Sequence, residues 1–172
     1  MRSFLIFILL FLSIVSAAQR AVRVPASFSE KLKLLGLDKI YRASGLGQPT
    51  SLRADFNGDG TEDLAVTVVN LTNSKEGIII LHGKTNKYFV FGAGTAFSSG
   101  SDDFEWMNKW RLYTKKYTSE TTFNKEGDIL GSKKVKLKHP GLFVQAFEDG
   151  AFKSGGIIVW DEKKYKWIHQ GD

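Results

Sequence analysis

The chain has 172 residues, a formal net charge of +6 and no cysteine. This length suits one domain with a core of its own and is too short for two ordinary domains. The lack of cysteine excludes a disulfide framework, thiol chemistry and lipid attachment through a cysteine. The basic excess is concentrated in the second half, at 115–116, 133–138 and 163–166. No DNA-binding or RNA-binding signature accompanies it, so we expect no nucleic-acid partner.

Residues 1–18 have the pattern of a secretory signal peptide. Arg2 gives a positive start, residues 4–15 are almost wholly apolar, and residues 16–18 supply the small side chains of a cleavage site. The apolar run is shorter than the ~20 residues of a membrane-spanning helix. We therefore expect a secreted or periplasmic protein without a stable membrane anchor after cleavage, in which residues 19–172 form a single β-rich domain. In that setting the basic excess favours solubility or attraction to acidic envelope polymers.

After the signal segment, the sequence predicts one short helix followed mainly by strands. Ser27 or Ser29 can cap a helix over residues 29–36, and Gly36 can end it. Beyond it, apolar and β-branched runs separated by turn residues predict antiparallel hairpins. The predicted hairpins pair 77–82 with 87–91, 121–123 with 128–130, and 135–138 with 142–144, and further strands are predicted at 50–54 and 64–69.

Residues 102–110 are the exception to the strand pattern. Asp102 can cap a helical turn, and Phe104, Met107 and Trp110 fall three apart, which predicts a short helix. We therefore expect a mainly β domain of antiparallel sheets and hairpins with one or two short helices, and α+β is the open alternative.

Residues 156–167 repeat the pattern of residues 77–90. Each segment has a glycine, a β-branched strand, a short basic turn and a return strand that begins Lys-Tyr. A duplicated hairpin would give this pattern, and so would two ordinary antiparallel hairpins in one sheet. The second is favoured, because the later copy lacks the loop described next.

The segment Asp55-Phe56-Asn57-Gly58-Asp59-Gly60-Thr61-Glu62-Asp63 is the most informative part of the chain. Ca²⁺ takes about six to eight oxygen ligands, and alternating side chains of a short loop can supply them. Gly60 lies where such a loop turns sharply, often with a positive φ. Side-chain oxygens fall at loop positions 1, 3, 5 and 9, from Asp55, Asn57, Asp59 and Asp63.

A helical calcium hand does not fit this loop. It needs a bidentate Glu at position 12, where this chain has Val66, and it needs flanking helices where this chain continues as a strand. An Asp/Asn/Gly-rich turn that binds nothing is the alternative to a metal site, because these residues also suit tight turns.

Residues 54–66, with the pattern D-x-[DN]-x-[DN]-G-x-x-D followed by an apolar strand, resemble the calcium loops of FG-GAP and VCBS-type repeats. Such repeats occur in integrin α-subunit propellers and in many secreted bacterial proteins. Propellers repeat the unit several times, whereas this chain has one copy, so the resemblance covers the loop and not a propeller. It implies a structural Ca²⁺ bound by the side chains of Asp55, Asn57, Asp59 and Asp63 and by the backbone carbonyl of Thr61.

The second half of the chain is rich in aromatic residues. Most of them fit core or cross-strand packing in hairpins, and an exposed subset would bind a sugar or a protein by stacking. The candidate partner-binding residues are Trp106, Trp110, Trp160 and Trp167. His82, His139 and His169 have no metal-ligand spacing and fit solvent or hairpin positions better than catalytic ones.

These observations favour a non-enzymatic calcium-binding module that binds a protein or glycan at the cell envelope. A small hydrolase of envelope polymers is the rival, with Asp102, Asp103 and Glu105 as its acid and base. Acids at a helix N-terminus are the simpler interpretation of those three residues. An inhibitor or immunity protein that blocks an acidic enzyme cleft is the third hypothesis.

Overall fold

The computed structural model describes residues 22–97 and 101–171, so the predicted signal peptide lies outside the described residues. Every strand pairing in this part of the chain is antiparallel, and the predicted mainly β fold with a short helix is confirmed. The elements are α1 (Ala26–Leu34), β1 (Tyr41–Ala43), β2 (Ser51–Ala54), β3 (Asp63–Asn70), β4 (Glu76–Leu81), β5 (Tyr88–Gly92), β6 (Lys109–Tyr113), β7 (Tyr117–Phe123), β8 (Ile129–Lys136), β9 (Gly141–Glu148), β10 (Ala151–Trp160) and β11 (Tyr165–Gly171).

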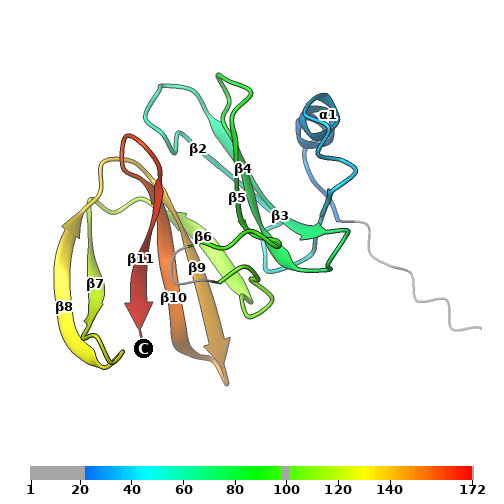
Figure 1. Cartoon of the computed structure of the whole chain (residues 1–172). Helices are drawn as coiled ribbons and strands as arrows, with labels where there is room; N and C mark the ends of the chain where they lie inside the picture. Colours follow the sequence, from blue (N-terminus) through cyan, green and yellow to red (C-terminus); the bar gives the residue numbers. More distant parts are fainter. Residues whose placement is uncertain (1–21, 98–100, 172) are drawn as a thin grey trace, which may run out of the picture.

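The elements form four layers that follow one another across the molecule (Figure 1). Helix α1 lies on the outside, against a first sheet ordered β1-β3-β4-β5, in which β2 also pairs with β3. A second sheet, ordered β11-β10-β9-β6, packs on the other face of the first. The hairpin of β7 and β8 forms the last layer. Among the residues described, no helix has the length and apolar character needed to cross a membrane.

Alternating side chains of the central strands fill the spaces between these layers. In β4, Ile79 and Leu81 belong to the cluster that also contains Phe28 of α1. Ile78 and Ile80 point the other way, into the cluster shared with the second sheet. Because successive strand residues face opposite sides, a strand buried on both faces must be apolar throughout. This explains the unbroken apolar run at 77–81.

The predicted cap at the start of the first helix is wrong, and the predicted glycine at its end is confirmed. The helix begins at Ala26 after Pro25, with no side-chain cap, so the prediction of Ser27 or Ser29 as the cap is wrong. Both serines lie inside the helix. Gly36, with a φ of +68°, follows the helix end as expected, since glycine adopts this conformation at little cost.

The predicted helix over residues 102–110 is absent from the structure. The Oδ1 atom of Asp103 accepts hydrogen bonds from the backbone N–H groups of Glu76 and Glu105, each at 3.0 Å, which holds a turn beside β4. Trp110 then enters β6 and pairs with Val144 of β9. Tertiary pairing overrides the three-residue spacing of the apolar side chains here.

Two of the three predicted hairpins are confirmed, at β4–β5 and β7–β8. The third is wrong, because β8 and β9 lie in different sheets although a short turn joins them. A strand has two edges, and those of β9 already pair with β6 and β10. The chain therefore crosses from one layer to the next at 137–140.

The hairpins with similar sequences, β4–β5 and β10–β11, lie in separate sheets rather than in one. They pack face to face through their aromatic residues. The rings of Phe89 and Trp160 have centroids 5.6 Å apart, and those of Phe91 and Tyr165 are 5.3 Å apart. The two hairpins thus form much of the interface between the sheets.

Candidate metal loop and aromatic pocket

The candidate metal loop is the connection between β2 and β3. These strands pair directly, with Ala54 opposite Asp63, so the loop forms the tip of a hairpin at one end of the first sheet. Gly58 and Gly60 have φ values of +76° and +82°, a conformation that glycine adopts easily. A Cβ atom at Gly58 would lie 2.1 Å from His139 Cε1, so the loop also touches the turn before β9.

The loop winds around the carboxylate of Asp55. Its Oδ1 atom accepts hydrogen bonds from the N–H groups of Gly58 at 2.7 Å and Asp59 at 3.1 Å, and its Oδ2 atom accepts one from Gly60 at 2.9 Å. Asn57 Oδ1 accepts a hydrogen bond from Asp59 N, and Asp59 Oδ1 accepts one from Thr61 N, both at 2.9 Å. The alternating oxygens are therefore held by the loop's own amides.

The side chain of Asp63 is fully buried and accepts hydrogen bonds from two loops. Its Oδ2 atom accepts a hydrogen bond from Phe56 N at 3.0 Å, and its Oδ1 atom accepts one from Gly83 N at 2.9 Å. Burial raises the pKa of this carboxyl, while the two amides and nearby His82 act in the opposite direction. Asp63 thus connects the candidate metal loop to the β4–β5 turn.

His82 connects the same loop to the second sheet. The side chain is 3% exposed, with Nδ1 at 3.0 Å from Asn57 Nδ2 and Nε2 at 2.9 Å from the hydroxyl oxygen of Tyr165. Burial lowers the pKa of His82, which favours the neutral ring. Because the Nδ2 atom of Asn57 can only donate, Nδ1 of His82 accepts, and Nε2 carries the proton and donates it to the hydroxyl oxygen of Tyr165. His82 thus lies in the β4–β5 hairpin, where its backbone N–H donates to the carbonyl of Lys87, but it is buried and not a solvent residue. A histidine directly after an apolar strand was the sequence signal for this position.

The residues of the loop fit a calcium ion by their donor chemistry. Asp55, Asn57, Asp59 and the carbonyl of Thr61 offer oxygens only, which a hard cation prefers. Within residues 22–97 and 101–171, no Lys, Arg or His side chain forms an ion pair with Asp55, Asp59 or Asp63. In the same ranges, no three Asp, Glu or His side chains form a metal-binding group by themselves. Binding through Asp63 requires its oxygens to serve the ion and the two amides together.

Two of the four candidate tryptophans come together in a small pocket of about 170 Å³. The rings of Trp106 and Trp167 lie 6.3 Å apart at 89°, and Phe104 packs against both. Trp106 is 37% exposed at the mouth. His169 also lines the pocket, and its buried Nε2 atom has no hydrogen-bond partner among the residues described. The pocket therefore combines aromatic faces with an unsatisfied polar atom.

The other two tryptophans lie elsewhere. Trp110 is 1% exposed in the core, where its indole N–H donates to the carbonyl of Pro49, so it is not available to a partner. Trp160 is half-buried and packs against His82 and Tyr165, with ring centroids 5.6 and 5.0 Å away. Trp160 thus packs around His82 between the two sheets and does not line the aromatic pocket.

The acidic residues of the hydrolase hypothesis have structural contacts. Asp102 forms an ion pair with Lys75, and Asp103 accepts the two backbone hydrogen bonds that hold the turn beside β4. Glu105 is exposed at that turn.

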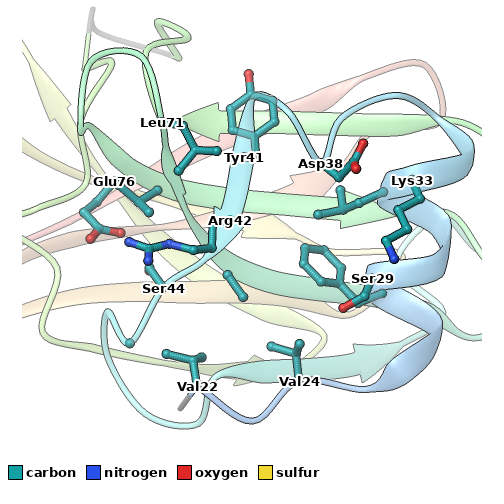
Figure 2. A pocket seen from close by; sticks show the side chains of 15 residues that line it. Val22, Val24, Ser29, Lys33, Asp38, Tyr41, Arg42, Ser44, Leu71 and Glu76 are labelled. Atoms are coloured by element: carbon teal, nitrogen blue, oxygen red, sulfur yellow. The ribbon is translucent and has the colours of Figure 1, made fainter. Parts of the chain in front are cut away.

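A larger groove of about 920 Å³ lies between α1 and β1 (Figure 2). Figure 2 shows Glu76 and Arg42 close together at one end, while Asp38 and Lys33 lie toward the helix at the other end. The two carboxyl side chains that line the groove, those of Asp38 and Glu76, lie toward its opposite ends in Figure 2.

Comparison with known proteins found no matching family model, no matching curated protein and no matching solved structure. The resemblance of residues 54–66 to FG-GAP and VCBS-type loops therefore stays a prediction from the loop itself.

Proposed function

We propose that the protein is a secreted or periplasmic calcium-binding β domain, which acts as a non-enzymatic binding module for a protein or glycan of the cell envelope. The observation that carries the proposal is the wrapping of the loop around Asp55. The carboxylate of Asp55 accepts hydrogen bonds from three backbone N–H groups of the loop. This arrangement orders the alternating oxygen donors before an ion arrives. The absence of a cationic side-chain partner for the three loop aspartates, within the described residues, leaves a charge that Ca²⁺ would neutralise.

The proposed role of the ion is structural. Asp63 reaches the β4–β5 turn, and Asn57 reaches the second sheet through His82. An ion held by Asp55, Asn57 and Asp59 would therefore tie the loop to both sheets. Because the folded loop binds the ion and the unfolded chain does not, binding would add directly to stability.

The aromatic pocket supports the binding part of the proposal. Its volume of about 170 Å³ is smaller than the roughly 300–1,000 Å³ of pockets for drug-sized ligands, so it suits one sugar ring or one side chain. Trp106 and Trp167 offer flat apolar faces, and Ser154 and His169 add polar side chains to the lining. Sugars present apolar C–H faces and polar edges, which fits this combination.

Calcium titration tests the proposal. Ca²⁺ at a hundred times its Kd would stabilise the purified, exported protein by about 2.7 kcal/mol. In a domain of this size that raises the Tm by roughly 5–10 °C. Asp59→Ala should abolish the rise. Asp128→Ala is the matched control, because Asp128 lies in another Asn/Asp turn and accepts a hydrogen bond from Asn124. Equal Tm values in chelator and in excess Ca²⁺ would contradict the metal site.

The hydrolase hypothesis is not favoured, because Asp102 and Asp103 are engaged in local contacts that stabilise the fold. A panel of labelled envelope polymers, incubated with the protein and analysed for shorter products, would detect hydrolysis directly.

A further inference from the structure

The three basic segments of the sequence meet around one groove between hairpin β7–β8 and the second sheet. The groove has a volume of about 440 Å³. Lysines from strand β8, from the turn that follows it and from β11 line the groove, together with the carboxylates of Glu120 and Asp161 and with apolar side chains. The lysines are Lys133, Lys136, Lys138 and Lys166. We call this site the lysine groove.

Backbone pairing brings these distant segments together. Leu137 N donates a hydrogen bond to the carbonyl of Lys116 at 2.9 Å, which places 115–116 beside the end of β8. Lys138 forms an ion pair with Glu162 at 3.1 Å, which joins the β8–β9 turn to the β10–β11 turn. The turn at 163–164 therefore adds its lysines to the same end of the molecule.

The lysines of the groove keep much of their charge available to a ligand. Lys133, Lys138 and Lys166 pair with Glu120, Glu162 and Asp161, but their side chains remain 62%, 65% and 54% exposed. Ion pairs this exposed are weak and are screened by salt. An anionic ligand with several charges can therefore compete with these carboxylates.

Lys136 contributes a charge with no such competitor. It is exposed, and none of the ion pairs in the described ranges involves it. Neighbouring Lys134 lies over the ring of Tyr117, 4.2 Å from its centroid, so it is held in place while remaining charged. Because successive side chains of a strand point to opposite faces, Lys134 and Lys136 lie on the face of β8 opposite Lys133 and Val135, so Lys136 reaches the groove from its rim.

Apolar side chains also line the groove. They come from Val135 and Leu137 on the hairpin side and from Ile168 of β11. This combination of charged and apolar side chains suits a polymer that has both regularly spaced anionic groups and C–H faces. The groove lining contains lysine and no arginine among the described residues, whereas bidentate phosphate recognition favours arginine.

We propose that the lysine groove binds a linear acidic polysaccharide, with the anionic groups on Lys133, Lys138 and Lys166, further charge from Lys136 at the rim, and the sugar rings on the apolar side chains of the lining. The proposal rests on the binding function proposed above, because it names the class of envelope polymer that the module takes. It does not rest on the calcium loop, which contributes none of the lining residues.

Titration of labelled polymers against the purified, exported protein tests the proposal. Dextran sulfate and polygalacturonate are the acidic probes, and neutral dextran of equal length is the reference. We expect both acidic polymers to bind. The affinity should fall steeply as the salt concentration rises, because each contact between a lysine and an anionic group of the polymer releases counterions. Neutral dextran should not bind at this groove.

The double variant Lys133→Gln/Lys138→Gln should lower the affinity for both acidic polymers about tenfold or more, as expected for two lost charge contacts. Lys39→Gln/Lys125→Gln is the matched control, since both lysines are exposed and lie outside the groove. It should change the affinity less than twofold. An equal loss in both variants would overturn the site, because net charge alone would then explain binding.

Further measurements distinguish a polysaccharide from other classes of partner, and distinguish the lysine groove from the calcium site. Tighter binding to phosphatidylglycerol vesicles or to duplex DNA, lost in the same double variant, would overturn the polysaccharide in favour of a membrane or a nucleic acid. Asp59→Ala should lose the calcium response while it retains dextran sulfate binding. If calcium stabilises the protein but no acidic polymer binds, the lysine-groove proposal fails alone.

Discussion

His82 Nε2 lies 2.9 Å from the hydroxyl oxygen of Tyr165, and this contact joins the metal-loop side of the first sheet to the second sheet. Both side chains are buried. The other ring nitrogen of His82 contacts Asn57 in the candidate metal loop. The loop is therefore coupled to the packing of the two sheets through the imidazole ring of His82.

Tyr165→Phe should destabilise the protein by about 1–3 kcal/mol, because it leaves the buried Nε2–H group of His82 without an acceptor. Urea unfolding, followed by circular dichroism, measures the change. Tyr88→Phe is the control, because Tyr88 is 42% exposed and its loss should stay within about 0.5 kcal/mol. Equal stabilities of the two variants would show that the contact contributes little.

Asp63→Asn should destabilise the protein with or without calcium. Each carboxylate oxygen of Asp63 accepts one hydrogen bond from a backbone N–H group. The side chain of asparagine would instead turn an NH₂ group toward Phe56 N or Gly83 N, so two donors would face each other. A buried polar group left unpaired costs about 1–3 kcal/mol. Denaturation in chelator isolates this effect, and Asp59→Ala serves as the comparison. An Asp63→Asn loss that appears only in added Ca²⁺ would assign Asp63 to the ion alone.

Glu76→Gln should stabilise the protein at neutral pH. Burial, together with the negative charges of Asp103 and Glu105, raises the pKa of Glu76 above its ordinary value of 4.5. The folded state then holds the proton at pH values where the unfolded chain has lost it, so wild-type stability falls as the pH rises through the folded pKa. A neutral glutamine avoids that loss.

The variant should therefore have a higher Tm than the wild type at pH 7. The difference should vanish below pH 4.5, where Glu76 is protonated in both states. Thermal melts from pH 3.5 to 7.5 measure it. A constant difference across this range would point to packing instead of ionisation.

Trp106→Ala and Trp110→Ala should separate binding from stability. Trp110 is 1% exposed, so its truncation should cost about 3–5 kcal/mol. Trp106 is 37% exposed, so its truncation should cost much less while it removes one wall of the aromatic pocket. Guanidinium unfolding measures the first effect, and a screen of immobilised glycans measures the second. Retained glycan binding by a folded Trp106→Ala variant would exclude the pocket.

Local sequence was sufficient to predict features that depend on neighbouring residues. The hairpins β4–β5 and β7–β8 followed from strand-forming runs around short polar turns, because turn residues and strand propensity act over a few positions. The alternating oxygens of Asp55, Asn57 and Asp59 were equally visible, since they lie in one short loop. Their hydrogen bonds to the loop's own amides follow from the same proximity.

Only the tertiary structure decided which elements face one another. The pairing of β9 with β6 and β10, instead of β8, depends on burial of its two faces between layers that are distant in sequence. The contact of His82 with Tyr165 and the gathering of Lys116, Lys138 and Lys166 at one end have the same origin. The sequence shows the local pattern around each of these residues. The packing of the two sheets across a shared core determines which of them come into contact.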